Sequence, residues 1–231
     1  MTESDVIRVE HTLGVTPRIP TRSYADQAVS WPATGQHILA HYDESSIVVY
    51  QAYRPSIGSY AIEHQQLGGP DFSFSRMSWI KPNFLWMMYR SGWGTKEGQE
   101  ITLGLRISLD FFETLLEQAV PSTYDGSTFA SEAQWKNALA ASTVRLQWDP
   151  DHAPSGISLK RRAIQLGLRG AALAALAGEE LIEVIDLTAF VKAQRLHAIG
   201  EDLNQLLSPT ERVYVPRSLE ARQRAHVTAV P

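Results

Sequence analysis

The feature that most restricts the fold of this chain is its alternation of two kinds of short apolar segment. Segments rich in β-branched and aromatic residues predict strands at 45–53, 99–108, 143–150 and 180–188. Apolar residues at helical spacing predict helices at 54–69, 81–94, 109–120, 131–142, 157–178 and 189–207. Because these elements follow no regular βαβ order, they favour the α+β class, with a mixed sheet and packed helices in a single domain.

Length and composition set the expected organisation of the chain. Its 231 residues can bury a large core, so we expect an N-terminal arm at 1–30, an α+β domain at 31–207 and a C-terminal tail at 208–231. The net charge of −4 argues against binding of nucleic acid by the whole surface, although a local basic patch is compatible with it. The chain contains no cysteine, which excludes disulfides and thiolate nucleophiles and favours a cytoplasmic location.

Two observations concern membranes. The first 14 residues are polar and lack the basic and apolar regions of a signal peptide. The longest apolar-rich stretch, 170–178, is far shorter than the ~20 residues that cross a bilayer. We therefore expect a soluble protein without a membrane partner, while its oligomeric state is left open.

The segment RMSWIKPNFLWMMYRSGWGTK, residues 76–96, places cations among large apolar side chains. These cations are Arg76, Lys81, Arg90 and Lys96. One interpretation is a core helix from which the cations reach solvent. The other is an anion site in which Trp79 or Trp93 stacks on a flat base. Because no acidic residue lies between Phe72 and Lys96 to pair with the cations, the segment predicts an anion site.

The segment VRLQWDPDH, residues 144–152, brings polar groups to the end of a predicted strand. His152 with Asp149 would supply acid and base for catalysis. Alternatively, Asp-Pro-Asp is a turn that closes the strand. The spacing of the two aspartates and the histidine in this segment matches no specific set of metal ligands, so we predict no metal site.

Three more arginines are candidates for phosphate contacts. On the predicted helix 157–178, Arg161 and Arg162 lie on or beside a polar stripe, which is either a solvated face or a phosphate clamp. Arg54 comes just before a helix that starts at Pro55, where the helix dipole opposes a cation but favours a bound anion. Alternatively, Arg54 pairs with Glu63 or with an acidic residue distant in the sequence.

Several familiar signatures are missing. The sequence contains no GxxxxGK[ST], GxGxxG, HExxH or GxSxG. The common nucleotide triphosphatases, dehydrogenases, zinc proteases and α/β-hydrolases are therefore not expected.

Four segments, VYQAYRPSI, RMSWIKPNFLWMMYRSGWGTKEGQE, QWDPDH and RRAIQLGLRG, together resemble the family catalogued as domain of unknown function 4291. The resemblance runs from about Gln36 to Arg195 and implies a single domain of bacterial and fungal distribution in which these segments form one unit. A distant similarity to ADP-ribosyltransferase-like folds transfers no catalytic residue. The usual first-strand motif of those enzymes ends in Gly or Thr, and here YQAYR takes its place.

These features lead to two hypotheses. The first is an enzyme that binds a nucleotide or nucleic-acid phosphate in a cleft floored by tryptophan. A special case of this hypothesis is an NAD-dependent ADP-ribosyltransferase, with NAD as cofactor and Glu100 as the catalytic carboxylate. The side chains expected to converge on that cleft are Arg54, Arg76, Lys81, Arg90 and either Arg161 or Arg162. The second is a non-catalytic module that binds RNA or protein through an exposed Trp/Met surface.

Overall fold

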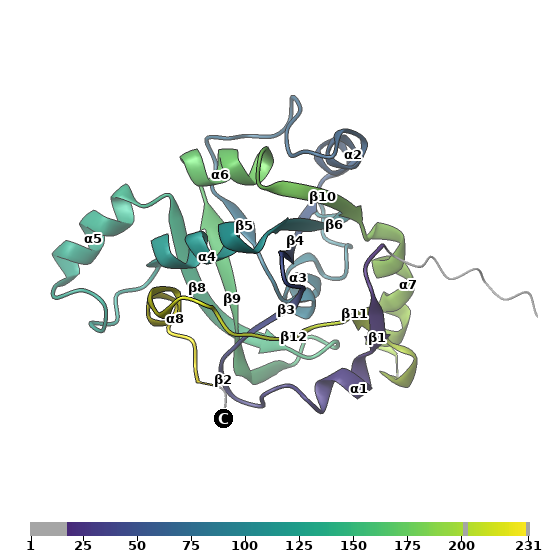
Figure 1. Cartoon of the computed structure of the whole chain (residues 1–231). Helices are drawn as coiled ribbons and strands as arrows, with labels where there is room; N and C mark the ends of the chain where they lie inside the picture. The colour runs from purple at the N-terminus through teal and green to yellow at the C-terminus, as the bar shows by residue number, and fades with distance from the viewer. Residues whose placement is uncertain (1–17, 201–202, 230–231) are drawn as a thin grey trace, which may run out of the picture.

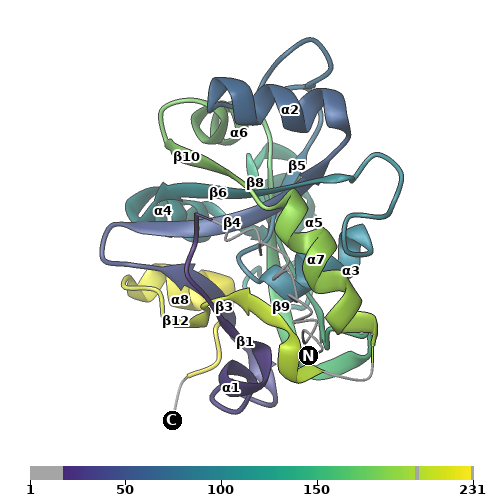
Figure 2. The same cartoon turned by 90° about the vertical axis from the view of Figure 1, so that its right-hand side faces the viewer.

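The computed structural model describes residues 18–200 and 203–229. Within them, eight α-helices pack on two five-stranded sheets and one two-stranded sheet (Figures 1 and 2). This arrangement confirms the predicted α+β class with a mixed sheet. No helix in these residues is long and apolar enough to cross a lipid bilayer.

The first five-stranded sheet is antiparallel and forms the centre of the molecule. Its strands run in the order β10 (Leu181–Asp186), β6 (Ile101–Ser108), β4 (Ser46–Tyr53), β3 (Ile38–Tyr42) and β12 (Arg212–Tyr214). Side chains alternate along β4, so Ile47 and Val49 enter one apolar core while Val48 and Tyr50 enter another. Burial on both faces explains why β4 reads as a nearly continuous apolar run.

Helices cover both faces of this sheet. Residues of α2 (Pro55–His64), α4 (Leu109–Gln118) and α6 (Gly170–Ala177) belong to the core that contains Ile47 and Val49. Residues of α3 (Phe84–Ser91) and α7 (Thr188–Ile199) belong to the core on the other face. Figure 2 shows α2 and α6 on one side of the sheet and α3 and α7 on the other.

The second five-stranded sheet is built around a long hairpin. Its antiparallel strands are β8 (Val144–His152) and β9 (Ser158–Leu168). Strand β7 (Val120–Pro121) runs parallel to β8, while β2 (Gly35–Gln36) and β5 (Ser78–Ile80) pair with the two ends of β9. Tyr50 of β4 exchanges two backbone hydrogen bonds with Lys81, at 2.7 and 3.2 Å, and so links the two sheets directly after β5.

The helix predicted at 157–178 is wrong over most of its length. Residues Ser158–Leu168 form β9, and only Gly170–Ala177 are helical. Ile164, Leu166 and Leu168 recur every second residue and enter the core, which is the spacing of a strand. The polar stripe expected on that helix therefore does not exist. The turn expected after Trp148 is also wrong, because β8 continues as a strand to His152.

The segment predicted as an N-terminal arm contributes to the fold from residue 18 onward. Strand β1 (Thr21–Ser23) pairs with β11 (Leu207–Pro209), and α1 (Tyr24–Ala28) follows it. Gln27 is buried, and its side-chain oxygen accepts a hydrogen bond from the Glu211 backbone at 2.8 Å. Residues 1–17 of the predicted arm lie outside the described residues.

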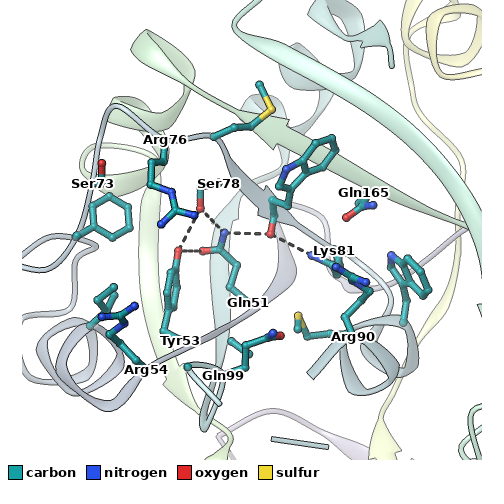
Figure 3. A pocket seen from close by; sticks show the side chains of 18 of the residues that line it. Gln51, Tyr53, Arg54, Ser73, Arg76, Ser78, Lys81, Arg90, Gln99 and Gln165 are labelled. Atoms are coloured by element: carbon teal, nitrogen blue, oxygen red, sulfur yellow. Dashed lines mark hydrogen bonds between the residues drawn. The ribbon is translucent and has the colours of Figure 1, made fainter. Parts of the chain in front are cut away.

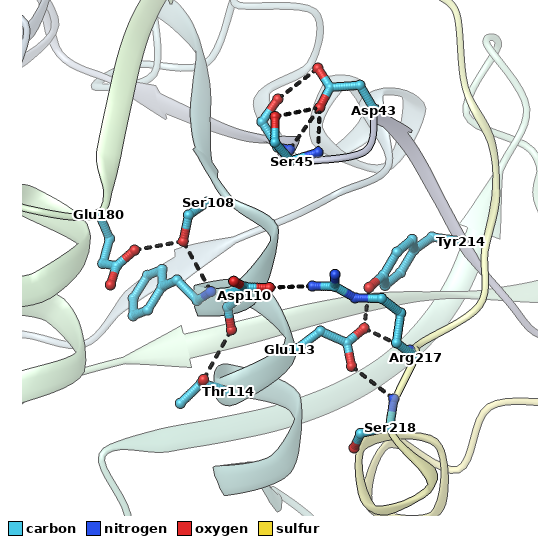
Figure 4. A network of polar contacts seen from close by, with 12 residues as sticks. Asp43, Ser45, Ser108, Asp110, Glu113, Thr114, Glu180, Tyr214, Arg217 and Ser218 are labelled. Carbon is cyan, nitrogen blue, oxygen red and sulfur yellow. Dashed lines mark hydrogen bonds and ion pairs between the residues drawn. The ribbon is translucent and has the colours of Figure 1, made fainter.

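The segment predicted as a C-terminal tail is also built into the fold. Strand β12 extends the central sheet, and α8 (Leu219–Ala225) packs on α4. Buried Glu113 of α4 accepts hydrogen bonds from the Tyr214 hydroxyl and from the backbone of Arg217 (2.9 Å) and Ser218 (3.2 Å), as Figure 4 shows. One carboxylate therefore holds the chain between β12 and α8 against the domain.

The remaining predicted helices are present. Helix α5 (Glu132–Ala141) lies at the edge of the molecule in Figure 1 and begins after Ser131, whose hydroxyl accepts from Gln134. A short 3₁₀ turn, η1 (Leu203–Gln205), follows α7.

Candidate functional site

A cavity of about 930 Å³ lies where the two sheets meet. Strands β4, β5, β8 and β9, helix α3 and the loops before β5 and before β6 contribute to its wall, and Figure 3 shows its side chains from close by. Six residues singled out in the sequence line it: Arg54, Arg76, Trp79, Lys81, Arg90 and Asp149. The cation-rich segment 76–96 therefore contributes to a concave site.

Four cations reach this cavity from separate places in the fold. Arg54 lies at the N-cap of α2, Arg76 in the loop before β5, Lys81 just after β5, and Arg90 in the last turn of α3. In the residues that the structure describes, none of the four forms an ion pair. The three arginines are exposed, whereas Lys81 is only 6% exposed, so the arginines form the rim and Lys81 the base.

Lys81 is held in a setting that disfavours its charge. Its Nζ donates a hydrogen bond to the Trp79 carbonyl at 3.3 Å. Burial first, and then the positive charge of Arg90, lower the pKa of Lys81 to about 7, against the opposing effect of Asp149. A large part of the Lys81 population is therefore a neutral amine at neutral pH.

Helix α3 positions Arg90 because its ends are fixed. The Asn83 side chain accepts from the Trp86 backbone at 2.6 Å, and the Glu211 side chain accepts from the Phe84 backbone at 2.8 Å. At the other end, Gly92 adopts a left-handed conformation (φ 58°) that stops the helix. Burial raises the pKa of Glu211 to about 8, opposed by the hydrogen bond from Phe84.

A polar network that the sequence analysis missed joins β4 to β5 at the cavity wall. Gln51 donates to the Ser78 hydroxyl at 2.8 Å and to the Trp79 carbonyl at 3.1 Å, and it accepts from the Tyr53 hydroxyl at 2.7 Å (Figure 3). Burial raises the pKa of Tyr53 to about 12, so its hydroxyl stays protonated. The one available signal was a glutamine inside a buried, β-branched strand. The network fixes the segment that carries Arg76, Trp79 and Lys81.

Trp79 reaches the cavity because its neighbour on β9 is a glycine. Trp79 and Gly167 are paired residues of β5 and β9. A Cβ at position 167 would lie 2.9 Å from the indole of Trp79 and 2.7 Å from the sulfur of Met77. Only a residue without a side chain leaves room for the indole at this place.

Asp149 lines the cavity, but the predicted pairing of Asp149 with His152 is not formed. Gln147 and Gln165 each donate a side-chain hydrogen bond to the Asp149 carboxylate, at 2.8 and 2.7 Å. His152 lies beyond a register shift in β8 and does not line the cavity. It is buried, with its ring stacked on Tyr89 at a centroid distance of 3.5 Å, and burial lowers its pKa.

Arg161 and Arg162 do not join the other cations. The guanidinium of Arg161 is buried and forms an ion pair with Asp151 at 2.6 Å, while another of its nitrogens donates to the Pro32 carbonyl at 2.7 Å. Arg162 donates to the Trp148 carbonyl at 2.7 Å. Because 158–168 is a strand, these residues lie near its start, whereas Gln165 further along reaches the cavity. The predicted convergence therefore holds for four of the expected cations and fails for this pair.

Three more predicted site residues have other positions. Trp93 is 6% exposed, adopts a left-handed conformation (φ 57°) and donates its indole N–H to the Pro154 carbonyl at 3.1 Å. Lys96 donates to the Arg90 carbonyl at 2.7 Å, which places its charge at the negative end of α3. Glu100 accepts from the Gly98 backbone at 2.8 Å, and none of these three residues lines the cavity.

The acidic residues on either side of the acid-free segment 72–96 also line the cavity. Asp71 and Glu97 lie just outside residues 72–96 in the sequence, and both line the cavity. The site therefore presents both signs of charge, with a small formal excess of cations. In the described part of the chain, no three His, Cys, Asp or Glu side chains are placed to hold a metal ion.

The fold and the cavity define a mixed α/β domain with a polar site at the junction of two sheets. Residues 37–214 match the family model described as Domain of unknown function (DUF4291), and the chain belongs to this family. The match confirms the resemblance seen in the sequence and extends it beyond Arg195 to β12. No curated protein matches the chain.

Proposed function

We propose that the cavity binds the phosphate group of a nucleotide or nucleic acid and that the protein is an enzyme acting on this ligand. The observation that supports this proposal is the arrangement of Arg54, Arg76, Lys81 and Arg90 around one cavity, without an ion pair among the described residues. Cations gathered in this way repel one another, and the buried one, Lys81, also loses hydration. A bound anion offsets both costs.

The rim of the cavity suits a phosphate attached to a flat group. Guanidinium groups form two parallel hydrogen bonds with phosphate oxygens, and Arg54, Arg76 and Arg90 are exposed to receive them. Trp79 and Phe72 are partly exposed in the same wall and offer ring faces for stacking. The acids Asp71 and Glu97 supply acceptors for the hydroxyl or amine groups of a nucleoside.

Two side chains at the base of the cavity favour a catalytic function over ligand binding alone. Asp149 is oriented by two amides, and Lys81 is a buried amine. A carboxylate and an amine on one wall can exchange a proton with a bound substrate. Asp149 and Lys81 therefore take the acid and base roles for which Asp149 and His152 were the candidates in the sequence.

Two observations weigh against the alternatives. ADP-ribosyl transfer through Glu100 would need that carboxylate at the cavity, but the carboxylates that line it are Asp71, Glu97 and Asp149. A flat Trp/Met interface would need exposed side chains, but Trp86 and Trp93 are 4% and 6% exposed. Neither NAD chemistry nor a surface module has an observation of its own in its favour.

The proposal is tested by titrating a panel of nucleotides and short RNAs into the wild type and into variants of the rim. We expect Arg76→Ala and Arg54→Ala each to weaken binding roughly 10- to 100-fold, because a hydrogen bond to a charged group contributes about 1.5–3 kcal/mol. Arg22→Ala is the matched control, because Arg22 is an exposed arginine on β1 outside the cavity. Equal binding by the Arg76 and Arg22 variants, or no binding of any panel member by the wild type, would refute the proposal.

A further inference from the structure

We propose that Lys81 is a nucleophile that forms an imine with the carbonyl carbon of a phosphate-bearing aldehyde or ketone. The phosphate part of this inference rests on the proposed function. The amine part rests on the position of Lys81 in the cavity. It names a substrate class that phosphate binding alone does not specify.

The position of Lys81 is unusual for a lysine. Buried lysines are rare and normally pair with a carboxylate. Lys81 is 6% exposed and lines the cavity, and in the described residues its amine has a hydrogen bond to the Trp79 carbonyl but no ion pair. A lysine held in this way gives up hydration without gaining a counter-ion, which favours a chemical role over a structural one.

The neutral form of this amine is available near neutral pH. With a pKa of about 7, roughly half of Lys81 is unprotonated at pH 7. For an ordinary lysine with a pKa near 10.5, that fraction is smaller by a factor on the order of 10³. Only the neutral amine carries the lone pair that attacks a carbonyl carbon, so the cavity prepares Lys81 for this reaction.

The reaction balances without an oxidant or a reductant. The nitrogen lone pair of Lys81 bonds to the carbonyl carbon, and the carbonyl electrons move to oxygen, which takes a proton to give a carbinolamine. The proton on oxygen comes from the nitrogen. The nitrogen then loses its second proton, the hydroxyl gains a proton and leaves as water, and a carbon–nitrogen double bond remains. Asp149 lines the same cavity and can carry the proton from nitrogen to oxygen, because Gln147 and Gln165 hold its carboxylate in place.

Two sources share the required ligand chemistry. A free sugar phosphate has an aldehyde or ketone in its open-chain form. A nucleic acid that has lost a base has an aldehyde at the sugar, next to phosphates. The exposed rim arginines accommodate either, so the experiment carries one arm for each source.

The test uses pyridoxal 5′-phosphate, an aldehyde that bears a phosphate, followed by reduction with borohydride and peptide mapping by mass spectrometry. The chain has four other lysines, all exposed: Lys96, Lys136, Lys160 and Lys192. At pH 7 we expect Lys81 to be modified at least ~10-fold faster than any of them, given the larger fraction of neutral amine. The comparison is made within one molecule, so it does not depend on a variant that folds.

Two variants and two further probes complete the test. Lys81→Arg keeps the cation without a reactive amine and should abolish the fast modification, whereas Lys160→Arg should leave it unchanged. Ribose 5-phosphate and an oligonucleotide with one abasic site are trapped in parallel, and the probe that modifies Lys81 faster identifies the source. Modification of Lys81 at or below the rate of Lys160 with all three probes would overturn the inference.

The inference and the proposed function can fail separately. If nucleotides bind and Arg76→Ala weakens them, but Lys81 is not trapped, then only the inference is refuted. If Lys81 is trapped rapidly, but neither inorganic phosphate nor Arg76→Ala slows the trapping, then the amine is reactive and the phosphate site is refuted. Rapid trapping that phosphate and Arg76→Ala both slow supports both proposals.

Discussion

Replacement of Lys81 by methionine should change the pH dependence of stability. Methionine has a similar length, fills the base of the cavity and carries no charge at any pH. The pKa of Lys81 is lowered from 10.5 in the unfolded chain to about 7 in the folded protein. Between these values the unfolded chain binds more protons than the folded protein, so the contribution of Lys81 to wild-type stability falls as the pH falls from 10.5 towards 7. Lys81→Met removes this loss.

The size of the effect follows from the shift in pKa. One pKa unit corresponds to about 1.4 kcal/mol, and the linkage relation then gives a wild-type loss of roughly 2 kcal/mol between pH 9 and pH 7. Below pH 7 the lysine is protonated in both states and the loss levels off. The free energy of unfolding of Lys81→Met, relative to wild type, should therefore rise by about 2 kcal/mol from pH 9 to pH 7 and then stay constant.

Urea unfolding of both proteins at pH 6, 7, 8 and 9 measures this difference. Lys160→Met is the control, because an exposed lysine should give a difference that does not change with pH. A pH-independent difference for Lys81→Met would show that the folded protein keeps Lys81 charged, and it would refute the reasoning about burial. The same variant should lose the fast reaction with pyridoxal 5′-phosphate even if it is more stable at pH 7.

Two further predictions concern residues behind the cavity. Because the pKa of Glu211 is raised from 4.5 to about 8, the unfolded chain loses its proton first, and the contribution of Glu211 to wild-type stability should fall by roughly 2 kcal/mol from pH 6 to pH 8, opposite in sign to that of Lys81. Glu211→Gln, which can still accept from Phe84, should remove this contribution, so its free energy of unfolding relative to wild type should rise by about 2 kcal/mol from pH 6 to pH 8 in urea unfolding. A difference that does not change with pH would contradict this. Gly167→Ala should displace the indole of Trp79 and lower the free energy of unfolding by about 1–3 kcal/mol. It should also weaken nucleotide binding in the titration used for the arginine variants, whereas unchanged binding would show that Trp79 does not contact the ligand.

Local signals predicted most of the helices but only four of the strands, β4, β6, β8 and β10. Helix α3 could be located because Pro82 lies near its start and a glycine, Gly92, ends it. Strand β9 could not be located, since GAALAALAG directly after it has a strong helical pattern and its strand character depends on pairing with β8. The position of 18–30 and 208–229 in the fold depends on contacts between distant segments, such as the pairing of β1 with β11, which a single sequence does not reveal.

The candidate site was predicted only where its signal was local. The missing acids between residues 72 and 96 indicated Arg76, Lys81 and Arg90 without any knowledge of the fold. Arg161 is likewise a cation without a nearby acidic residue in the sequence, but it forms an ion pair with Asp151 across the β8–β9 hairpin, which balances its charge. Gln51 and Ser78 were missed because each is an ordinary polar residue until β4 and β5 lie side by side.

The contact between Glu211 and α3 has a consequence for how the protein is made. The Phe84 backbone amide is satisfied by a side chain 127 residues later in the chain, and the Trp31 indole donates to the backbone of the same Glu211. A nascent chain that has left the ribosome as far as β9 already contains every residue that lines the cavity, yet the first turn of α3 still lacks this partner. Contacts between residues so far apart in sequence give a high contact order, which slows folding. The site should therefore mature after residue 211 has emerged, and polypeptides that end before it should be targets for proteases rather than partly active forms.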